Sequence, residues 1–316
     1  GEGMVHTHLV GSRLYGAALP GSDVDLIIEL APAVREELLQ GAGAGEGDAD
    51  RLRLVAGRAV MAFRRHFEAD SARRRWRPID VALDTRQPVL RVERVWGDSA
   101  PPTPVEVLFD QHLLALRKSA LLATCVATDP RTLVLSQLVR HWAGVRGLVG
   151  QQRGFPSGYA WCQMVVFFCQ RRLGQPAGLI PRTAAEHSAF IGAIAPEIPA
   201  IGAVAPEAAQ EAVALLPAFF AFYAGEFDWR TEAVSVRLGR RARRRARPPQ
   251  DGSAASGSSA GLCVEDPVEP EVDLASPYLD DLRDAQLRKE LVRAATLLCD
   301  RSHCCAAWEA LLRAKK

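Results

Sequence analysis

The sequence predicts an α+β fold, with strands and helices in the first part and a mostly helical second part. Two observations lead to this prediction. Strand-like runs cluster in the first third of the chain, and the 3.6-residue apolar repeat of helices dominates beyond about residue 111. A chain of 316 residues, 48% of them hydrophobic, is long enough for two domains with separate cores. We expect the active site in the cleft between them.

The elements of this fold follow in chain order. Strands are expected at 7–10, 24–30, 78–83, 88–95 and 104–109. A helix over 51–67 interrupts them, because its apolar side chains lie close to one helical face. The second part should contain helices over 111–122, 130–148, 157–173, 208–224, 277–299 and 302–314. The predicted domains are therefore 1–120 and 121–316.

Two segments have the composition of flexible chain. Residues 41–50 are rich in Gly and Ala, and residues 239–262 start with an arginine run and continue with Ser and Gly. We interpret the second as a flexible linker. The alternative is that its arginines contact RNA phosphates, since a net charge of only +2 leaves nucleic-acid binding to local patches.

The seven cysteines include no CxxC pair, which is typical of reduced thiols in an intracellular protein. No run of about 18 apolar residues occurs, so we expect no membrane span. The chain starts at Gly1 without a targeting segment, and such a segment would have been removed.

The stretch from Gly11 to Ile28 carries the most chemical information. Gly11 and Ser12 end a predicted strand and begin a short helix, so backbone N–H groups there and the Ser12 hydroxyl can bind a phosphate. On the next strand Asp23 and Asp25 are two residues apart, so both carboxylates point to one face. Carboxylates beside a phosphate suit Mg²⁺. The alternative is a surface strand with two solvated aspartates.

This Gly-Ser turn followed by Asp-Val-Asp resembles the DNA polymerase β-like nucleotidyltransferases. From Leu9 to about Arg293 the chain is similar to the terminal uridylyltransferases and non-canonical poly(A) polymerases of that superfamily. It looks most like the minimal trypanosomal, minor editosome-associated members. The resemblance implies a nucleotidyltransferase head with a mixed sheet and flanking helices, and a helical, poly(A) polymerase-associated domain for nucleotide recognition. It also implies two Mg²⁺ or Mn²⁺ ions.

The resemblance also indicates a third carboxylate. In the family a strand aspartate fills this role, and the matching segment here, VEVLF, offers Glu106. A two-metal site needs such a ligand to activate the attacking hydroxyl. Asp80, on another predicted strand, is the alternative.

Further matches fall in the nucleotide-binding part. Ser119 and Arg140 stand where the family has a serine near the nucleotide and a lysine for the triphosphate, and Tyr159 stands where a tyrosine stacks on the base. A second family lysine is Gly144 here, so its contact is missing or supplied by Arg146.

The segment CVEDPVEPEVDLA (263–275) resembles the family's nucleotide-recognition segment. Its key pair is Asp266 and Glu269. A carboxylate accepts hydrogen bonds and can read the uracil N3–H, which adenine lacks. The pair therefore favours UTP.

These observations predict a template-independent RNA uridylyltransferase, which adds uridylate from UTP to RNA 3′-hydroxyl ends and releases pyrophosphate. Its catalytic and metal-binding residues are Asp23, Asp25 and Glu106. Expected partners are UTP, an RNA 3′ end and an RNA-editing complex, with no membrane, and the expected location is the mitochondrion. Two alternatives stay open: a non-canonical poly(A) polymerase that uses ATP, and a non-catalytic RNA-binding scaffold that keeps the fold.

Overall fold

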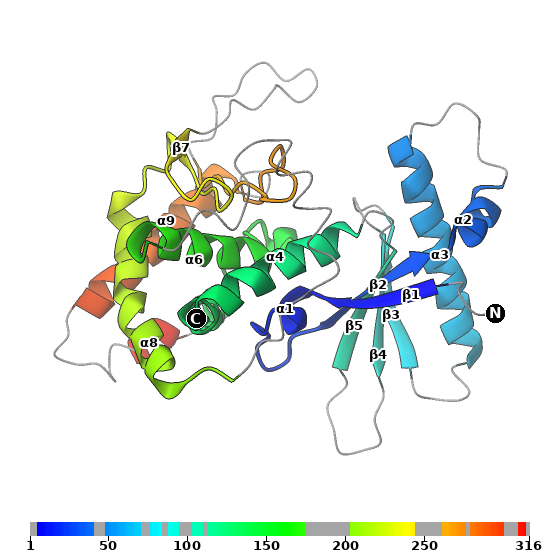
Figure 1. The fold of residues 1–316 in the computed structure, drawn as a ribbon, viewed down its shortest axis with the longest axis horizontal. Coiled ribbons are helices and arrows are strands. Elements are labelled where there is room, and N and C mark those ends of the chain that lie inside the picture. Colours follow the sequence, from blue (N-terminus) through cyan, green and yellow to red (C-terminus); the bar gives the residue numbers. More distant parts are fainter. Residues whose placement is uncertain are drawn as a thin grey trace. The chain divides into compact units, whose positions relative to one another are not determined.

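The computed structural model describes residues 5–40, 48–70, 76–83, 88–94, 103–109, 113–174, 203–243, 261–275, 279–299 and 309–313. The chain divides into two compact units, Gly1–Ala120 (unit 1) and Leu121–Lys316 (unit 2). The boundary falls within helix α4 (Leu114–Thr128). Figure 1 shows the elements of both units.

Unit 1 contains one five-stranded sheet. Its strands are β1 (Val5–Val10), β2 (Val24–Leu30), β3 (Trp76–Ala82), β4 (Val89–Arg94) and β5 (Thr103–Leu108). They lie in the order β1-β2-β5-β4-β3. Strands β2 and β5 are parallel, and the other neighbours are antiparallel. The predicted mixed sheet is therefore confirmed, and each predicted strand matches an observed one to within two residues at either end.

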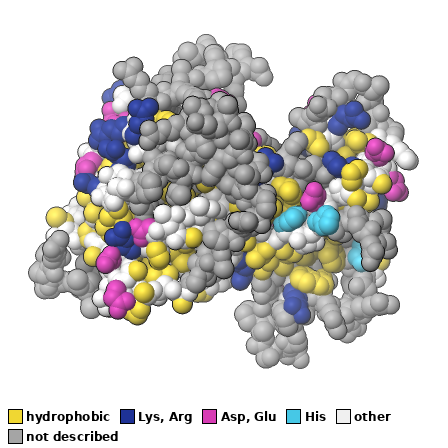
Figure 2. Space-filling model, viewed as in Figure 1, with side chains coloured by type: hydrophobic (Ala, Val, Ile, Leu, Met, Phe, Trp, Pro, Cys, Tyr) yellow, Lys and Arg dark blue, Asp and Glu magenta, His cyan; other side chains and the backbone are white. Residues whose placement is uncertain are grey.

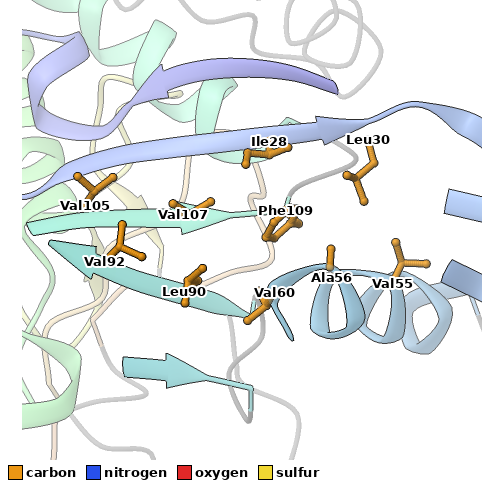
Figure 3. Close-up of a cluster of buried hydrophobic side chains, with 11 residues drawn as sticks. Ile28, Leu30, Val55, Ala56, Val60, Leu90, Val92, Val105, Val107 and Phe109 are labelled. Carbon is orange, nitrogen blue, oxygen red and sulfur yellow. The ribbon is translucent and has the colours of Figure 1, made fainter. Parts of the chain in front are cut away.

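One face of this sheet is covered by helix α3 (Asp48–Asp70), and helix α2 (Pro32–Leu39) packs against α3 (Figure 1). Figure 3 shows the core between the sheet and α3, in which every second strand residue points toward α3. The buried side chains are Ile28, Leu30, Val55, Ala56, Ala59, Val60, Leu90, Val92, Val105, Val107 and Phe109. Because strand side chains alternate, the residues between these apolar positions face the other side of the sheet.

Unit 2 is mostly helical. Its main helices are α5 (Pro130–Val145), α6 (Gly158–Arg172), α8 (Pro206–Ala221) and α9 (Asp281–Cys299). Helix α5 packs against both α6 and α8, and α8 packs against α9. The core is aromatic: Trp142 lies edge-on to Trp161 and Phe220, with ring centroids 5.7 and 4.6 Å away.

Helix α8 continues into a π-helical turn, η4 (Phe222–Glu226). By length and composition alone, the span Pro206–Glu226 is apolar enough to cross a membrane. Buried core helices pass the same test. Phe219, Phe220 and Tyr223 are completely buried, and the Tyr223 hydroxyl donates to the Met164 carbonyl oxygen at 2.8 Å. These side chains belong to the core of unit 2, while 33% of the apolar window as a whole is buried.

The structure corrects several boundaries. The helix expected over 51–67 runs from Asp48 to Asp70, and α2 was not expected. At the ends of the expected linker 239–262, Ala242–Arg243 form strand β7, which pairs with β6 (Glu232–Ala233), and Leu262 is fully buried. The linker prediction is therefore wrong at both ends, and 244–260 lie outside the described residues. The flexible segment predicted over 41–50 is wrong for 48–50, which belong to α3, and its remainder, 41–47, lies outside the described residues. Most of the helix predicted over 302–314 also lies outside them, although 309–312 are helical.

Candidate active site

The glycine-serine turn lies directly over one aspartate. Gly11 starts the short helix α1 (Gly11–Leu14) with φ 69°, and a Cβ added there would overlap the Asp25 Oδ2 atom and lie 2.8 Å from its Cγ. Only glycine allows this approach, because it lacks a Cβ and adopts positive φ freely. Ser12 is buried beside it.

Ser119 holds this turn from helix α4. The Gly11 N–H donates to the Ser119 Oγ atom at 2.9 Å, and the Ser119 hydroxyl donates to the Ala115 carbonyl oxygen at 2.7 Å. Ser119 is 4% exposed. The structure therefore brings Gly11, Ser12, Ser119 and Asp25 together within unit 1.

A row of charged residues crosses the sheet on the face opposite α3. In the strand register Asp25 (β2) pairs with Glu106 (β5), Glu106 pairs with Arg91 (β4), and Arg91 pairs with Asp80 (β3). Directly paired residues point to the same face. Neighbouring strands lie about 4.8 Å apart. Glu106 is thus one strand from Asp25, whereas Asp80 is three strands away, an arrangement that favours Glu106 over Asp80 as the partner of Asp25.

Arg91 binds Glu106 directly. Its Nε atom lies 2.7 Å from the Glu106 Oε1 atom, and the Glu106 side chain is 22% exposed. The hydrogen bond to Glu106 and the charge of Glu106 raise the pKa of Arg91, and the charges of Asp80 and Asp23 add to this. The guanidinium therefore sits in a field dominated by the predicted metal ligands.

The donor chemistry suits Mg²⁺, which binds one or two carboxylates together with substrate phosphates. The part of the chain that the structure describes contains no group of three His, Cys, Asp or Glu side chains close enough to hold a metal. Asp25 and Glu106 are register neighbours, and the arginine holds the Glu106 carboxylate. Of the three predicted ligands, the structure therefore places Asp25 and Glu106 side by side and does not bring Asp23 into one metal-holding group with them. Phosphate oxygens of a bound substrate would supply further ligands.

Sequence reasoning missed the residue that secures Asp23. Arg13, on α1, donates from Nη2 to the Ser22 carbonyl oxygen at 2.7 Å and from Nε to the Asp23 carbonyl oxygen at 3.1 Å. It thereby ties the loop before β2 to the Gly-Ser turn. Its place directly after Gly-Ser was the available signal, but nothing in the sequence shows which carbonyl groups an arginine reaches.

Two predicted nucleotide contacts lie close together in unit 2. Tyr159 is partly exposed in the first turn of α6, and Arg140 lies against the preceding residue, Gly158. A Cβ added at Gly158 would lie 3.0 Å from the Arg140 Nε atom. Glycine at 158 thus leaves room for the guanidinium beside the tyrosine.

The suggestion that Arg146 replaces the missing family lysine is wrong. Arg146 is 7% exposed and forms two hydrogen bonds with Glu290 of α9, from Nε at 2.9 Å and from Nη2 at 2.8 Å. Gly144 is exposed, with nothing within 4 Å of an added Cβ. The position that holds the second family lysine is therefore exposed in this chain, and the Arg146 side chain forms a buried ion pair instead.

The acidic segment forms a compact turn. Asp266 is completely buried, and its Oδ1 atom accepts from the Val268 N–H at 2.9 Å and the Glu269 N–H at 3.4 Å. Glu269 is partly exposed. Asp266 therefore holds the turn that presents Glu269, a structural task that the sequence did not predict.

Part of unit 2 matches a known protein family. Residues 213–272 match the family described as Cid1 family poly A polymerase. "Caffeine-induced protein 16" of Schizosaccharomyces pombe is 36% identical over 66 residues, which are 21% of this chain and 5% of that protein. The match thus spans a small part of that relative's length.

Solved structures resemble the whole chain. Terminal uridylyl transferase 4 from Trypanosoma brucei, with bound UTP and UMP, has a TM-score of 0.67 at 19% identity over 93% of this chain and 87% of its own. A structure of mtPAP in complex with UTP has a TM-score of 0.68 at 18% identity, covering 98% of this chain and 64% of its own. The Cid1 poly(U) polymerase has a TM-score of 0.68 at 18% identity, covering 99% and 88%. The resemblance stated from the sequence is confirmed at the level of the fold, which these solved structures share over nearly the whole chain.

Proposed function

We propose that the protein is a template-independent RNA uridylyltransferase, which transfers uridylate from UTP to an RNA 3′-hydroxyl and releases pyrophosphate. The observation that carries the proposal is the pairing of Asp25 with Glu106 on adjacent parallel strands, directly beneath the Gly11 turn. Carboxylates beside a phosphate-binding turn are the arrangement that nucleotidyl transfer requires. In this proposal residues 1–120 are the catalytic domain and 121–316 the nucleotide-recognition domain.

Asp23, Asp25 and Glu106 are the residues that would hold two Mg²⁺ or Mn²⁺ ions. When bound, such ions neutralise phosphate charge and lower the pKa of the attacking hydroxyl. The chain's own residues position the reactants. The Gly11 turn and Ser12 bind phosphate oxygens, Ser119 fixes that turn, and Arg13 keeps the Asp23 loop in place. Positioning and charge neutralisation supply most of the catalysis in reactions of this class.

In unit 2, Tyr159 would stack on the base and Arg140 would neutralise triphosphate charge. Their closeness at the start of α6 supports a shared nucleotide contact. Glu269 would accept the hydrogen bond from uracil N3–H, with Asp266 holding its turn. UTP is bound in the structures of the trypanosomal enzyme and of mtPAP.

A poly(A) polymerase that uses ATP is the second candidate, because the matching family is described as a poly A polymerase. The experiment that separates the two is extension of a labelled short RNA with Mg²⁺ and each of the four nucleoside triphosphates in turn. The proposal expects UTP to be incorporated fastest. Preferential ATP use would establish the alternative, and no extension with any nucleotide would favour the non-catalytic scaffold.

The mitochondrial location and the editing-complex partner rest on the resemblance, and the match to mtPAP gives the location weak support. Fractionation of cells that contain the tagged protein, followed by mass spectrometry of co-purifying proteins, tests both. A cytosolic protein without RNA-processing partners would contradict them.

A further inference from the structure

A buried ion pair lies directly behind the acidic turn of unit 2. Arg237 donates from Nε to the Glu265 Oε1 atom at 3.0 Å and from Nη2 to the Oε2 atom at 3.1 Å. The Ser235 hydroxyl donates to the same Oε1 atom at 2.8 Å. We call these three residues the clamp. Both charged side chains are only 11% exposed, so solvent does not screen the pair strongly.

The clamp is built on extended backbone. Val234 forms a parallel bridge with Val264, and the Glu265 N–H donates to the Val234 carbonyl oxygen at 2.9 Å. On the other side the Asp266 N–H donates to the Val272 carbonyl oxygen at 2.9 Å. The segment from Val264 to Asp266 therefore lies as a short strand between two others.

This strand turns neighbouring carboxylates in opposite directions. Successive side chains of an extended chain point to opposite faces. Glu265 shares its face with Ser235, and Asp266 shares the other face with Val264. Asp266 is completely buried on that face, where its Oδ1 atom caps the turn that presents Glu269. Holding Glu265 on one side thus fixes the direction of Asp266 on the other.

Helix α6 anchors the turn that carries Arg237. The Gln170 side chain donates from Nε2 to the Val236 carbonyl oxygen at 2.9 Å. Gln170 lies on the helix that begins with Gly158 and Tyr159. The turn that carries Arg237 is therefore tied to the helix of the proposed base-stacking residue.

We propose that Arg237 and Glu265 are positioning residues that orient the acidic turn and thereby set the affinity and choice of nucleotide. This inference rests on the proposed function for its nucleotide readout. Neither residue contacts the nucleotide in this account; both act through Asp266 and Glu269.

The test replaces the pair by apolar residues of similar volume, Arg237→Met with Glu265→Leu. Such a replacement of a buried pair is often neutral for stability, whereas removal of one partner is strongly destabilising. The matched control is Arg146→Met with Glu290→Leu, since that pair is also buried and doubly hydrogen-bonded in unit 2 but lies outside the acidic turn. Both variants are compared with the wild-type chain by melting temperature, amide hydrogen exchange and steady-state kinetics.

We expect faster exchange of the Val268, Glu269 and Val272 amides in the Arg237/Glu265 variant only. The KM for UTP should rise about tenfold, the effect of losing one hydrogen bond to a charged group, with kcat changed by less than about twofold. The preference for UTP over CTP should fall by a similar factor. The control should keep the wild-type KM and preference.

Equal exchange rates in the two double variants would overturn the inference. Faster exchange with an unchanged KM and preference would also overturn it, because the pair would then only brace the fold. If the Arg237/Glu265 double variant does not fold, Arg237→Lys, which keeps the positive charge beside Glu265 but cannot form the two-point hydrogen bond, gives the same readouts. The two failures are distinguishable. If the wild-type chain incorporates none of the four nucleoside triphosphates, the proposed function is contradicted. The hydrogen-exchange comparison needs no nucleotide, and it tests on its own whether the clamp orients the acidic turn.

Discussion

At the scale of single residues, Asp25 is the centre of the proposed chemistry. Asp25→Ala should abolish nucleotide addition, because it removes a carboxylate proposed to hold both metals, while the melting temperature should stay close to that of the wild type. Primer extension and thermal unfolding measure the two effects. Asp80→Ala is the control, since Asp80 lies on edge strand β3 in the same charged row. Appreciable extension by purified Asp25→Ala protein would contradict the assignment.

Glu106 can be tested by shortening its side chain. Glu106→Asp should retain more activity than Glu106→Ala, because it keeps an oxygen ligand and a partner for Arg91. Glu106→Ala also leaves the partly buried guanidinium without its hydrogen bond, which adds a stability cost. Extension rates at several Mg²⁺ concentrations would separate ligand loss from unfolding. The opposite pattern, an active Glu106→Ala and an inactive Asp80→Ala, would show that Asp80 is the third ligand.

Tyr159 should contribute to binding rather than to chemistry. Tyr159→Ala should raise the KM for UTP by about 5–150-fold, since one stacked base is worth roughly 1–3 kcal/mol. The loss should be similar for every nucleotide that the enzyme accepts, because stacking does not depend on base identity. Tyr159→Phe is the control, which keeps the ring. An unchanged KM in Tyr159→Ala would assign the ring to the packing of α6.

At the scale of elements, the N-terminus of α5 has an assigned cap. The Asp129 side chain accepts from the Arg131 N–H at 2.9 Å and binds the Arg131 guanidinium at 2.7 Å. Asp129→Ala should destabilise unit 2 by about 1–2 kcal/mol, the usual cost of a lost cap. The melting temperature should fall by roughly 2–8 °C. In Asp129→Asn the melting temperature should fall less, because an amide oxygen can still cap the helix. A fall in Asp129→Asn as large as that in Asp129→Ala would show that the charge, not the cap, stabilises the helix.

Elements with a strong pattern could be predicted from the sequence, and those without one could not. Helix α3 has a buried apolar face, whereas α2 buries no residue completely, so its sequence carried little periodic signal. Strand β7 was missed because it is only two residues long and lies in an arginine run. Figure 2 shows Lys and Arg side chains gathered beside β7, and Arg241 lies 3.0 Å from Glu232 of the paired strand. The arginine-rich composition indicates a solvent-exposed segment, but whether such a segment pairs as a strand depends on a partner elsewhere in the chain, here β6.

At the scale of the whole molecule, ligand binding should stabilise the fold by mass action. UTP with Mg²⁺ at about 100 times its dissociation constant should add about 2.7 kcal/mol to the free energy of unfolding. The melting temperature should rise by roughly 5–10 °C, as measured by scanning calorimetry. CTP at the same concentration should give a smaller rise. Equal shifts with all four nucleotides would contradict base selection.

The strands of the first part and the helices of the second could be predicted because local periodicity reports burial, whereas the mixed order of the sheet followed only from the family resemblance. The sequence also placed Asp25 and Glu106 on separate strands, but only the register shows that they are neighbours. The contacts of Arg146 and Asp266 could not be predicted for a related reason. The partner of Arg146 is Glu290 of another helix, and the partners of Asp266 are N–H groups of its own turn. The first contact depends on tertiary packing and the second on backbone direction, and spacing along the chain encodes neither.

The approach of Gly11 to Asp25 has a consequence for how this sequence can vary. Every single-base change in a glycine codon that alters the residue, stop codons aside, introduces Ala, Val, Ser, Cys, Trp, Arg, Asp or Glu, and each carries a Cβ. At Gly11 that atom meets the Asp25 carboxylate, whatever chemistry lies beyond it. At Gly144, where nothing lies within 4 Å of an added Cβ, the same codon changes meet open space. Random mutation can therefore explore position 144 step by step, whereas position 11 has no one-step neighbour that preserves the site.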